Sequence, residues 1–194
     1  MYSGHIDNVS PDWQLEGWID ELEGVLAKTS RTPLVAGCMV RSRHAFSYDV
    51  DKETGEISTS ELFSIETLNL RGAVSSIRGI ERLKNLRRFS VSGVRSSLSD
   101  ISPLAGLVRL RDISIFSTSI TSLQGLAPLR LLYRLRLDLN RIEDLSPLDQ
   151  LTRLTELSLG SNQIRDVFPL RRLARLKKLN LNSNQIRNLN PLTK

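Results

Sequence analysis

The chain has little of what disulfide-bonded, metal-binding or membrane-spanning proteins are built from. Its 194 residues include one cysteine, Cys38, and two histidines, His5 and His44. A single cysteine excludes an intramolecular disulfide and fits a reducing compartment. No apolar run approaches the roughly 18–20 residues that cross a membrane, and residues 1–8 lack the basic start and apolar run of a signal peptide. We therefore expect a cytoplasmic protein without a membrane span.

Residues that carry chemistry are equally sparse. Neither histidine has a cysteine, a histidine or a carboxylate at a recurrent metal-ligand spacing. Cys38 lies in the apolar run 34–40, where a cysteine is ordinarily a small buried side chain with a structural role. A nucleophile would need a base and an orienting group, and the glycines are scattered rather than gathered in a phosphate-binding loop. The sequence therefore predicts a protein that is not an enzyme and has no metal and no cofactor.

Leucine, in contrast, recurs at a fixed period. Segments 135–142, 157–164 and 179–186 align without a gap at a spacing of 22 residues, and a period of this size is typical of a solenoid. Upstream the pattern loosens: Thr118 stands where later units have Asn, one unit has 24 residues, and the first has 21. The pattern predicts six strands, centred at Leu68, Phe89, Ile113, Leu135, Leu157 and Leu179.

Each recurrent position has a physical reason. Leu157 and Leu159 are two residues apart, so on an extended backbone both point to the interior. Asn162 follows the strand, where its amide can bond to backbone groups of its own and neighbouring turns. Pro169 ends the extended path and pre-sets φ, and leucines three apart suit a short 3₁₀ turn on the outer side.

These positions resemble the leucine-rich repeat family, in its 22-residue class with the pattern LxxLxxLxLxxNxIxDLxPL. That class occurs in internalin-like proteins and in a regulatory subunit of protein phosphatase 1. The resemblance covers residues 62–194, with the last repeat truncated. It implies an α/β solenoid with a curved parallel sheet of about six strands on the concave side and short helical or 3₁₀ segments on the convex side. It also implies binding of a partner protein through the concave face, in a regulatory, scaffolding, inhibitor or immunity role.

Residues 1–61 precede the repeats and predict a cap. Ser10 and Pro11 are typical of a helix start, and an acidic amphipathic helix is expected over 11–28. Alternating residues predict strands at about 34–50 and 57–61, which would form a hairpin. The first repeat has an open apolar edge, so we expect the helix and hairpin to cover it. The alternative is a small separate interaction domain with Trp13 and Trp18 as its contacts.

Charge is divided between the two parts of the chain. Residues 1–66 hold 5 Lys/Arg against 12 Asp/Glu, whereas residues 67–194 hold 22 against 9. One interpretation is that the solenoid displays its arginines and lysines on the convex side for solubility. The other is that they attract an acidic partner, with segment 171–178 the densest part. Nucleic-acid binding is the alternative function, although aromatic side chains that could stack on bases are scarce.

Strand alternation predicts which side chains face a partner, because residues between inward leucines point outward. An aromatic residue beside arginines is the composition of an interface centre. Opposite charges could instead neutralise one another across strands, which leaves the outward phenylalanine unexplained. We predict six partner-binding residues in the middle of the concave face: Arg88, Asp112, Phe116, Arg134, Arg136 and Asp138.

The last repeat is a second candidate surface. Its apolar residues would have one uncovered side, so the sequence is either part of a longer array or is covered there by another molecule. A second copy of the chain is one such molecule, giving a homodimer. The residues of this predicted edge contact are Leu179, Leu181, Ile186 and Leu189.

Overall fold

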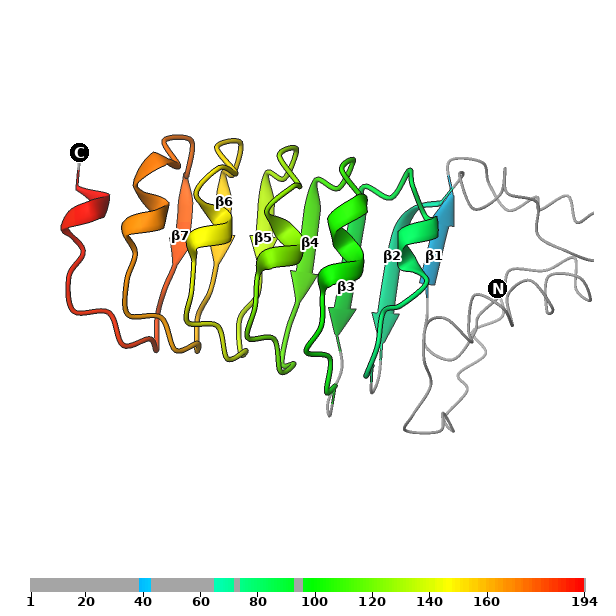
Figure 1. Ribbon diagram of the computed structural model, residues 1–194, viewed down its shortest axis with the longest axis horizontal. Coiled ribbons are helices and arrows are strands. Elements are labelled where there is room, and N and C mark those ends of the chain that lie inside the picture. The colour runs from blue at the N-terminus through cyan, green and yellow to red at the C-terminus, as the bar shows by residue number, and fades with distance from the viewer. Residues whose placement is uncertain (1–38, 43–64, 72–73, 93–95, 194) are drawn as a thin grey trace, which may run out of the picture.

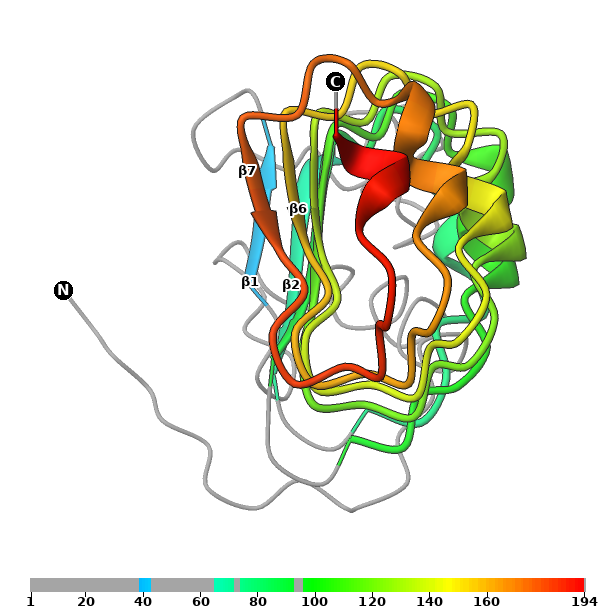
Figure 2. The same ribbon diagram turned by 90° about the vertical axis from the view of Figure 1, so that its left-hand side faces the viewer.

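The computed structural model describes residues 39–42, 65–71, 74–92 and 96–193. In these residues the chain forms a solenoid in which each turn pairs one strand with one short helix (Figure 1). Viewed along the solenoid, the strands lie on one side and the helices on the opposite side (Figure 2). The leucines of the repeat fill the space between these two layers, since they are the side chains that both layers turn inward.

The sheet has seven strands in the order of the sequence. Strands β2 to β7 are parallel, with every pair in register, and β1 pairs antiparallel with β2. All six predicted strand centres lie in β2 to β7, so the predicted parallel sheet is confirmed. The strands are β1 (Met39–Ser42), β2 (Ile65–Arg71), β3 (Arg88–Ser92), β4 (Asp112–Ile115), β5 (Arg134–Arg136), β6 (Glu156–Ser158) and β7 (Lys178–Asn180).

A 3₁₀ helix follows each of the strands β2 to β7, which confirms the short outer segments expected from the repeat. Four of these helices have a proline in their first turn, where the fixed φ of proline suits the helix and its missing N–H is not needed. The helices are η1 (Ile80–Arg82), η2 (Ser102–Gly106), η3 (Gln124–Leu126), η4 (Ser146–Leu148), η5 (Phe168–Arg172) and η6 (Asn190–Leu192).

The core is a stack of equivalent aliphatic side chains. Leu157 and Leu159 are 1% and 0% exposed, while Ser158 between them is half-buried on the sheet surface. The same inward alternation holds for Ile113 and Ile115 in β4. Each such side chain contributes roughly 1.5–3 kcal/mol when fully buried. Because neighbouring turns supply most of that burial, the stability of each repeat depends on the repeats packed against it.

A ladder of polar side chains follows the strands at the 22-residue spacing. Asn162 donates from Nδ2 to the carbonyl oxygens of Leu137, Leu159 and Gly160 at 3.0, 3.0 and 3.3 Å, and its Oδ1 accepts from the backbone N–H of Ile142 at 3.0 Å. Asn140 and Asn184 make the equivalent bonds. Buried turn amides and carbonyls, which are costly when unpaired, are satisfied in this way.

The ladder continues upstream with smaller hydroxyl side chains. Thr118, which replaces the Asn of later repeats, donates to Asn140 Oδ1 at 2.5 Å. One repeat earlier, Ser96 is buried and donates to the carbonyl of Val74 at 2.7 Å. The irregular repeats thus keep the ladder position and change only its residue type.

A second polar column lies just before the 3₁₀ helices. In each repeat a side-chain oxygen accepts the backbone N–H of the residue two positions later, as in the Asp144 to Ser146 and Asp166 to Phe168 contacts, both 2.8 Å. Such turns orient the chain as it enters the helix. Hydrogen bonding to Ser102, mainly from its backbone N–H, holds the pKa of Asp100 below its ordinary range. The six residues of this column are Ser76, Asp100, Ser122, Asp144, Asp166 and Asn188.

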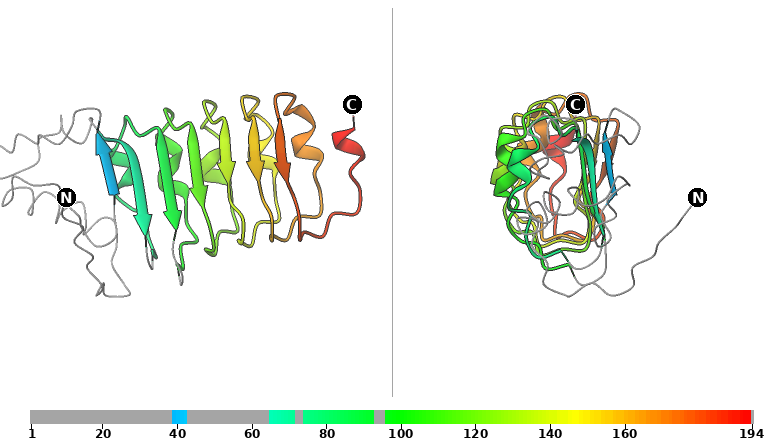
Figure 3. Two further views of the ribbon diagram at one scale, coloured as in Figure 1. Left: turned by 180° about the vertical axis from the view of Figure 1, so that it is seen from behind. Right: turned by 90° about the vertical axis from the view of Figure 1, so that its right-hand side faces the viewer.

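The N-terminal cap is described only at β1. The predicted helix 11–28 and the predicted strand at 57–61 lie outside the described residues. Strand β1 falls within the predicted segment 34–50 and pairs with the first repeat strand, Val40 opposite Leu68. An antiparallel strand therefore closes the N-terminal edge of the parallel sheet (Figure 3), where free backbone groups would otherwise invite pairing with another chain.

Candidate protein-binding surface

The outer surface of the parallel sheet, here called the sheet face, is the surface predicted to be concave. Its side chains lie in columns that cross the strands, because the register of every parallel pair matches the repeat. The first column is Thr67, Arg88, Asp112, Arg134, Glu156 and Lys178. The second is Asn69, Ser90, Ser114, Arg136, Ser158 and Asn180.

Four side chains on β4, β5 and β6 form one charged network. Arg134 donates to Asp112 at 2.7 Å and to Glu156 at 3.0 Å, and Arg136 donates to Glu156 at 2.5 Å. Hydrogen bonds to Asp112 and Glu156 raise the pKa of Arg134 further. Hydrogen bonds from Arg136 and then Arg134 hold the pKa of Glu156 below its ordinary range. The two guanidinium groups are thereby held in fixed positions while more than a third of each side chain stays exposed.

Asp138 belongs to a separate network. Its Oδ1 accepts hydrogen bonds from Ser158 Oγ at 2.6 Å, from the backbone N–H of Gly160 at 2.9 Å and from Asn180 Nδ2 at 3.1 Å. The network thus links Ser158 of β6 and Asn180 of β7 to Asp138, two positions after the end of β5. Arg88 is apart from both networks, since it donates to Thr67 Oγ1 at 3.2 Å.

Gly160 lies beneath the Asp138 to Asn180 contact. A Cβ atom at this position would stand 2.9 Å from both Asp138 Oδ1 and Asn180 Nδ2. A larger residue would displace the end of at least one of these side chains, so it would disturb the contact between Asp138 and Asn180.

Apolar side chains lie close in sequence to the charged network. Phe116, immediately after β4, is half-buried. Leu139 is 54% exposed and Tyr133 is 38% exposed, one after and one before β5. The Arg134 guanidinium lies 5.6 Å from the centre of the Tyr133 ring. Tyr133 and Leu139 thus expose apolar surface at the two ends of β5, in addition to the half-buried Phe116 at the end of β4.

Leu139 also has an unusual backbone. Its φ is 59°, in the left-handed region, and the equivalent residues of the other repeats are Ser117, Ser161 and Ser183 with φ between 54° and 56°. A bulky side chain is uncommon in this conformation, and this leucine buries less than half of its surface. The fold gives no reason for leucine instead of serine at this position.

The structure therefore groups the predicted residues in a way that the sequence did not specify. Asp112, Arg134 and Arg136 share one network, whereas Asp138 and Arg88 belong to others. Three residues were missed: Glu156, Tyr133 and Leu139. Glu156 could have been found from the alternation of charge along its column, and Leu139 from its departure from serine in the repeat.

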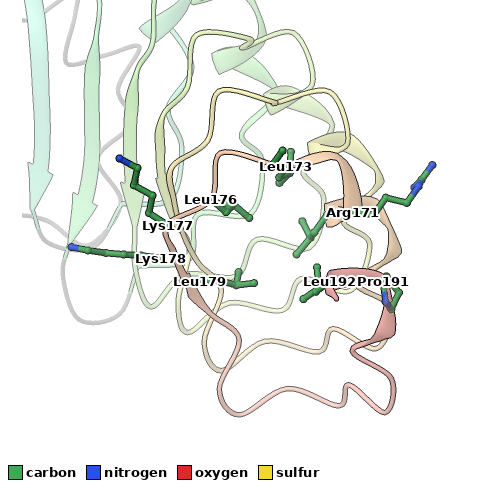
Figure 4. Close-up of a pocket in the computed structure, with 10 residues that line it drawn as sticks. Arg171, Leu173, Leu176, Lys177, Lys178, Leu179, Pro191 and Leu192 are labelled. Carbon is green, nitrogen blue, oxygen red and sulfur yellow. The ribbon is translucent and has the colours of Figure 1, made fainter. Parts of the chain in front are cut away.

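The predicted C-terminal edge is partly uncovered. Leu179 and Leu189 are 39% and 56% exposed, and Leu181 and Ile186 are half-buried, whereas their counterparts one repeat earlier are buried. Leu176, Leu179 and Leu192 line a hollow of about 250 Å³ at this end (Figure 4). Arg171, Lys177 and Lys178 also line this hollow, so two copies meeting face to face here would bring like charges together. The homodimer stays a prediction.

The described residues contain no group of three or more His, Cys, Asp or Glu side chains that could hold a metal ion. Among the same residues, no helix is long and apolar enough to cross a membrane. His5, Cys38 and His44 lie outside the described part of the chain.

A family model and one solved structure agree with this geometry. The family model described as leucine-rich repeats (2 copies) matches residues 130–172 and 152–194. An internalin (InlF) from Listeria monocytogenes is similar in structure, with a TM-score of 0.61 and 33% sequence identity; the match covers 66% of this chain and 38% of the internalin. An internalin C2 from the same organism has a TM-score of 0.45 and 26% identity, over 73% of this chain and 81% of that one. No curated protein matches in sequence.

Proposed function

Since the chain is a leucine-rich repeat protein with internalin-like repeats, a class that serves in general for protein interaction and is typically non-catalytic, we propose that it binds a partner protein through the sheet face. The contact is centred on β4, β5 and the residues that follow them. The match covers 38% of the internalin. The function of the whole internalin is therefore not assumed for this chain.

The observation that carries the proposal is the combination of Phe116 and Leu139 with two held arginines. Aromatic residues and arginine are enriched at interface centres because they bury large areas, and arginine adds directional hydrogen bonds. The carboxylates of Asp112 and Glu156 hold Arg134 and Arg136 in place, so less side-chain entropy is lost when a partner binds. Neutralisation across strands explains the charges, but it explains neither Phe116 nor Leu139.

The dimensions of the sheet face suit a protein partner. Adjacent strands are about 4.8 Å apart, so the six parallel strands span roughly 24 Å. A stable interface buries about 800 Å² on each partner, which such a surface can supply with the loops that flank it. We propose a regulatory, scaffolding, inhibitor or immunity role in the cytoplasm, a location that the single cysteine supports.

Affinity capture with the full chain as bait tests the proposal. The Phe116→Ala, Arg136→Glu double variant removes the aromatic side chain and reverses one guanidinium on the sheet face. The matched control is Phe168→Ala, Arg165→Glu, which makes the same two changes among exposed residues away from the sheet face. We expect the wild type and the control to capture the same proteins. The sheet-face variant should capture about tenfold less of them, or still less.

Urea unfolding of both variants shows whether each is folded before capture is compared. Equal loss of the captured proteins in both variants would contradict the proposal, and so would undiminished capture by the sheet-face variant. The second outcome would move the interface to another surface of the solenoid.

A further inference from the structure

Basic residues are concentrated on one long edge of the solenoid. The basic edge is defined here as segments 81–87, 105–111, 127–133, 149–155 and 171–177, which lead from the 3₁₀ helices to the next strand. Three of them include the last two residues of η1, η2 or η5. They hold 11 Lys/Arg and only two acidic residues, Glu81 and Asp149. In Figure 1 these segments lie at the top, where β3 to β7 begin.

The opposite edge has no such excess. Its segments, which join each strand to the following helix, are 74–78, 96–101, 117–123, 139–145, 161–167 and 183–189. They hold four basic and four acidic residues. The excess positive charge is therefore concentrated on the side of the solenoid where the chain leads from each helix to the next strand, and it includes Arg82, Arg171 and Arg172 at the ends of η1 and η5.

Most of this charge is not neutralised within the described part of the chain. Arg87 pairs with Glu66 at 3.5 Å and Arg172 with Asp149 at 3.8 Å. Arg109 and Arg130 donate to the side-chain amides of Asn85 and Gln150, which orient a guanidinium group without cancelling its charge. Eight basic residues of the edge have no ion pair with a carboxylate among the described residues: Lys84, Arg109, Arg111, Arg130, Arg153, Arg171, Arg175 and Lys177.

We propose that the basic edge binds the phosphate backbone of nucleic acid, independently of base sequence and separately from the sheet face. The edge repeats with the strands at about 4.8 Å per step, so its five segments span roughly 19 Å. A nucleic-acid strand places one phosphate about every 3.4 Å along a duplex, which brings about five or six phosphates alongside the edge.

The composition of the edge favours nucleic acid over an acidic protein. Protein interfaces have a core depleted in charge, whereas interfaces with nucleic acid are much more positively charged. Nine of the eleven basic residues are arginines, whose forked donors match phosphate oxygens in pairs. A regular series of cations also matches a polymer with a regular series of anions.

Fluorescence anisotropy with a labelled DNA duplex of about 20 base pairs tests the proposal on the full chain. We expect binding whose log affinity falls linearly with log salt, with a slope of about −4.5 to −5.4 for five or six phosphate contacts. Replacing Arg109, Arg111, Arg153 and Arg175 by glutamate should weaken binding at least tenfold and flatten the slope. Replacing the same four residues by glutamine should also weaken DNA binding, to a smaller extent. This variant shows that the loss of affinity does not come from misfolding caused by charge reversal.

The control variant replaces Arg78, Arg141, Arg165 and Arg187 of the opposite edge by glutamate and so makes the same change in net charge. It should alter DNA affinity less than about threefold at moderate salt, since the four sites lie away from the contacted phosphates. An equal loss in both glutamate variants would overturn the proposal, because net charge alone would then explain binding.

Two further results would also overturn it. One is the absence of DNA binding by the wild type; the other is competition by poly-L-glutamate as strong as that by unlabelled DNA, which would assign the edge to an acidic protein. The Phe116→Ala, Arg136→Glu variant should bind DNA as the wild type does, so failure of the sheet-face proposal and failure of this one are distinguishable.

Discussion

At the scale of single residues, the polar ladder shows how one side chain stabilises several turns. Asn162 closes hydrogen bonds in its own turn and in the preceding one, through both its amide nitrogen and its oxygen. It is 7% exposed, so water cannot replace those bonds easily. An interior position that looks polar and loop-like is thus part of the core.

We expect Asn162→Ala to lower the free energy of unfolding by about 2 kcal/mol or more, because the N–H of Ile142 and several carbonyls lose a buried partner. Urea unfolding followed by circular dichroism measures this change. Asn182→Ala is the control: Asn182 is exposed on the sheet face, and its substitution should change stability by no more than about 0.5 kcal/mol. Equal losses for the two variants would contradict the role given to the ladder.

Glu156 makes stability depend on pH. Its pKa is lowered by Arg136 and then by Arg134, from an ordinary value of 4.5. A carboxylate with a lowered folded pKa stabilises the fold above its unfolded pKa, and that contribution is lost as the pH falls through the folded value. Asp100 acts with the same sign from an ordinary value of 3.8.

We therefore expect Glu156→Gln to be less stable than the wild type at about pH 7, and the deficit to shrink at about pH 2, because the contribution of the carboxylate is lost as the pH falls through its folded pKa. Urea midpoints at the two pH values measure this difference. The control is Glu143→Gln, which removes an ion pair with Arg165. Both side chains of that pair are more than half exposed, so the stability of this variant should differ little from that of the wild type at either pH. A Glu156→Gln deficit that persists at low pH would point to packing instead of charge.

At the scale of the repeat, identical residues differ in energy according to their neighbours. Leu157 in β6 is covered by the turns on both sides and is 1% exposed, whereas Leu179 in β7 has a neighbour on one side only and is 39% exposed. The two leucines occupy equivalent positions in the repeat. Their burial differs because only Leu157 has a neighbouring strand on each side.

Truncation of these two leucines measures the contribution of stacking. Leu157→Ala should cost about 2–5 kcal/mol, the range for a fully buried leucine. Leu179→Ala should cost less than about 1.5 kcal/mol, because much of the removed surface already faces solvent. Similar losses in dilute solution would indicate that the C-terminal edge is covered by another molecule, which light scattering after size exclusion would identify as a second copy if the mass doubles.

At the scale of the whole molecule, the solenoid separates its surfaces by function. On the sheet face, Arg134 and Arg136 are paired with carboxylates, whereas the basic edge has more positive charge than its ion pairs neutralise. These surfaces meet where the strands begin, yet each has its own variants and controls. The N-terminal edge is closed by β1, which protects the free backbone groups of β2.

The importance of that closure can be tested by two truncations. Removal of residues 1–42 deletes β1, whereas removal of residues 1–38 leaves it in place. We expect the longer truncation to be less stable and to self-associate through β2, since an unpaired edge strand is a template for another chain. Urea unfolding and light scattering of both truncations measure the difference, and equal behaviour would show that β1 contributes nothing beyond the segment before it.

Much of the architecture followed from the sequence because it depends on short-range periodicity. Leucines two apart predict a strand with an inward face, and a spacing of 22 residues predicts the stacking of equivalent positions, so the six parallel strands and the 3₁₀ helices could be anticipated. The candidate surface followed in part: strand alternation predicted that Arg134, Arg136 and Asp112 share a face. The cap at 11–28 and 57–61 stays a prediction, because those residues lie outside the described part of the chain.

The sequence by itself therefore determined the repeat, its core and the columns of the sheet face. Only the tertiary structure decided that Glu156 holds both arginines, that Asp138 reaches Asn180 across Gly160, and that the excess positive charge lies on one edge. These features join residues 20 to 42 positions apart, and their side chains meet only when the path of each turn sets the lateral offset between repeats. Periodicity specifies which residues stack, whereas the shape of the turns specifies which of their polar atoms come within hydrogen-bonding distance.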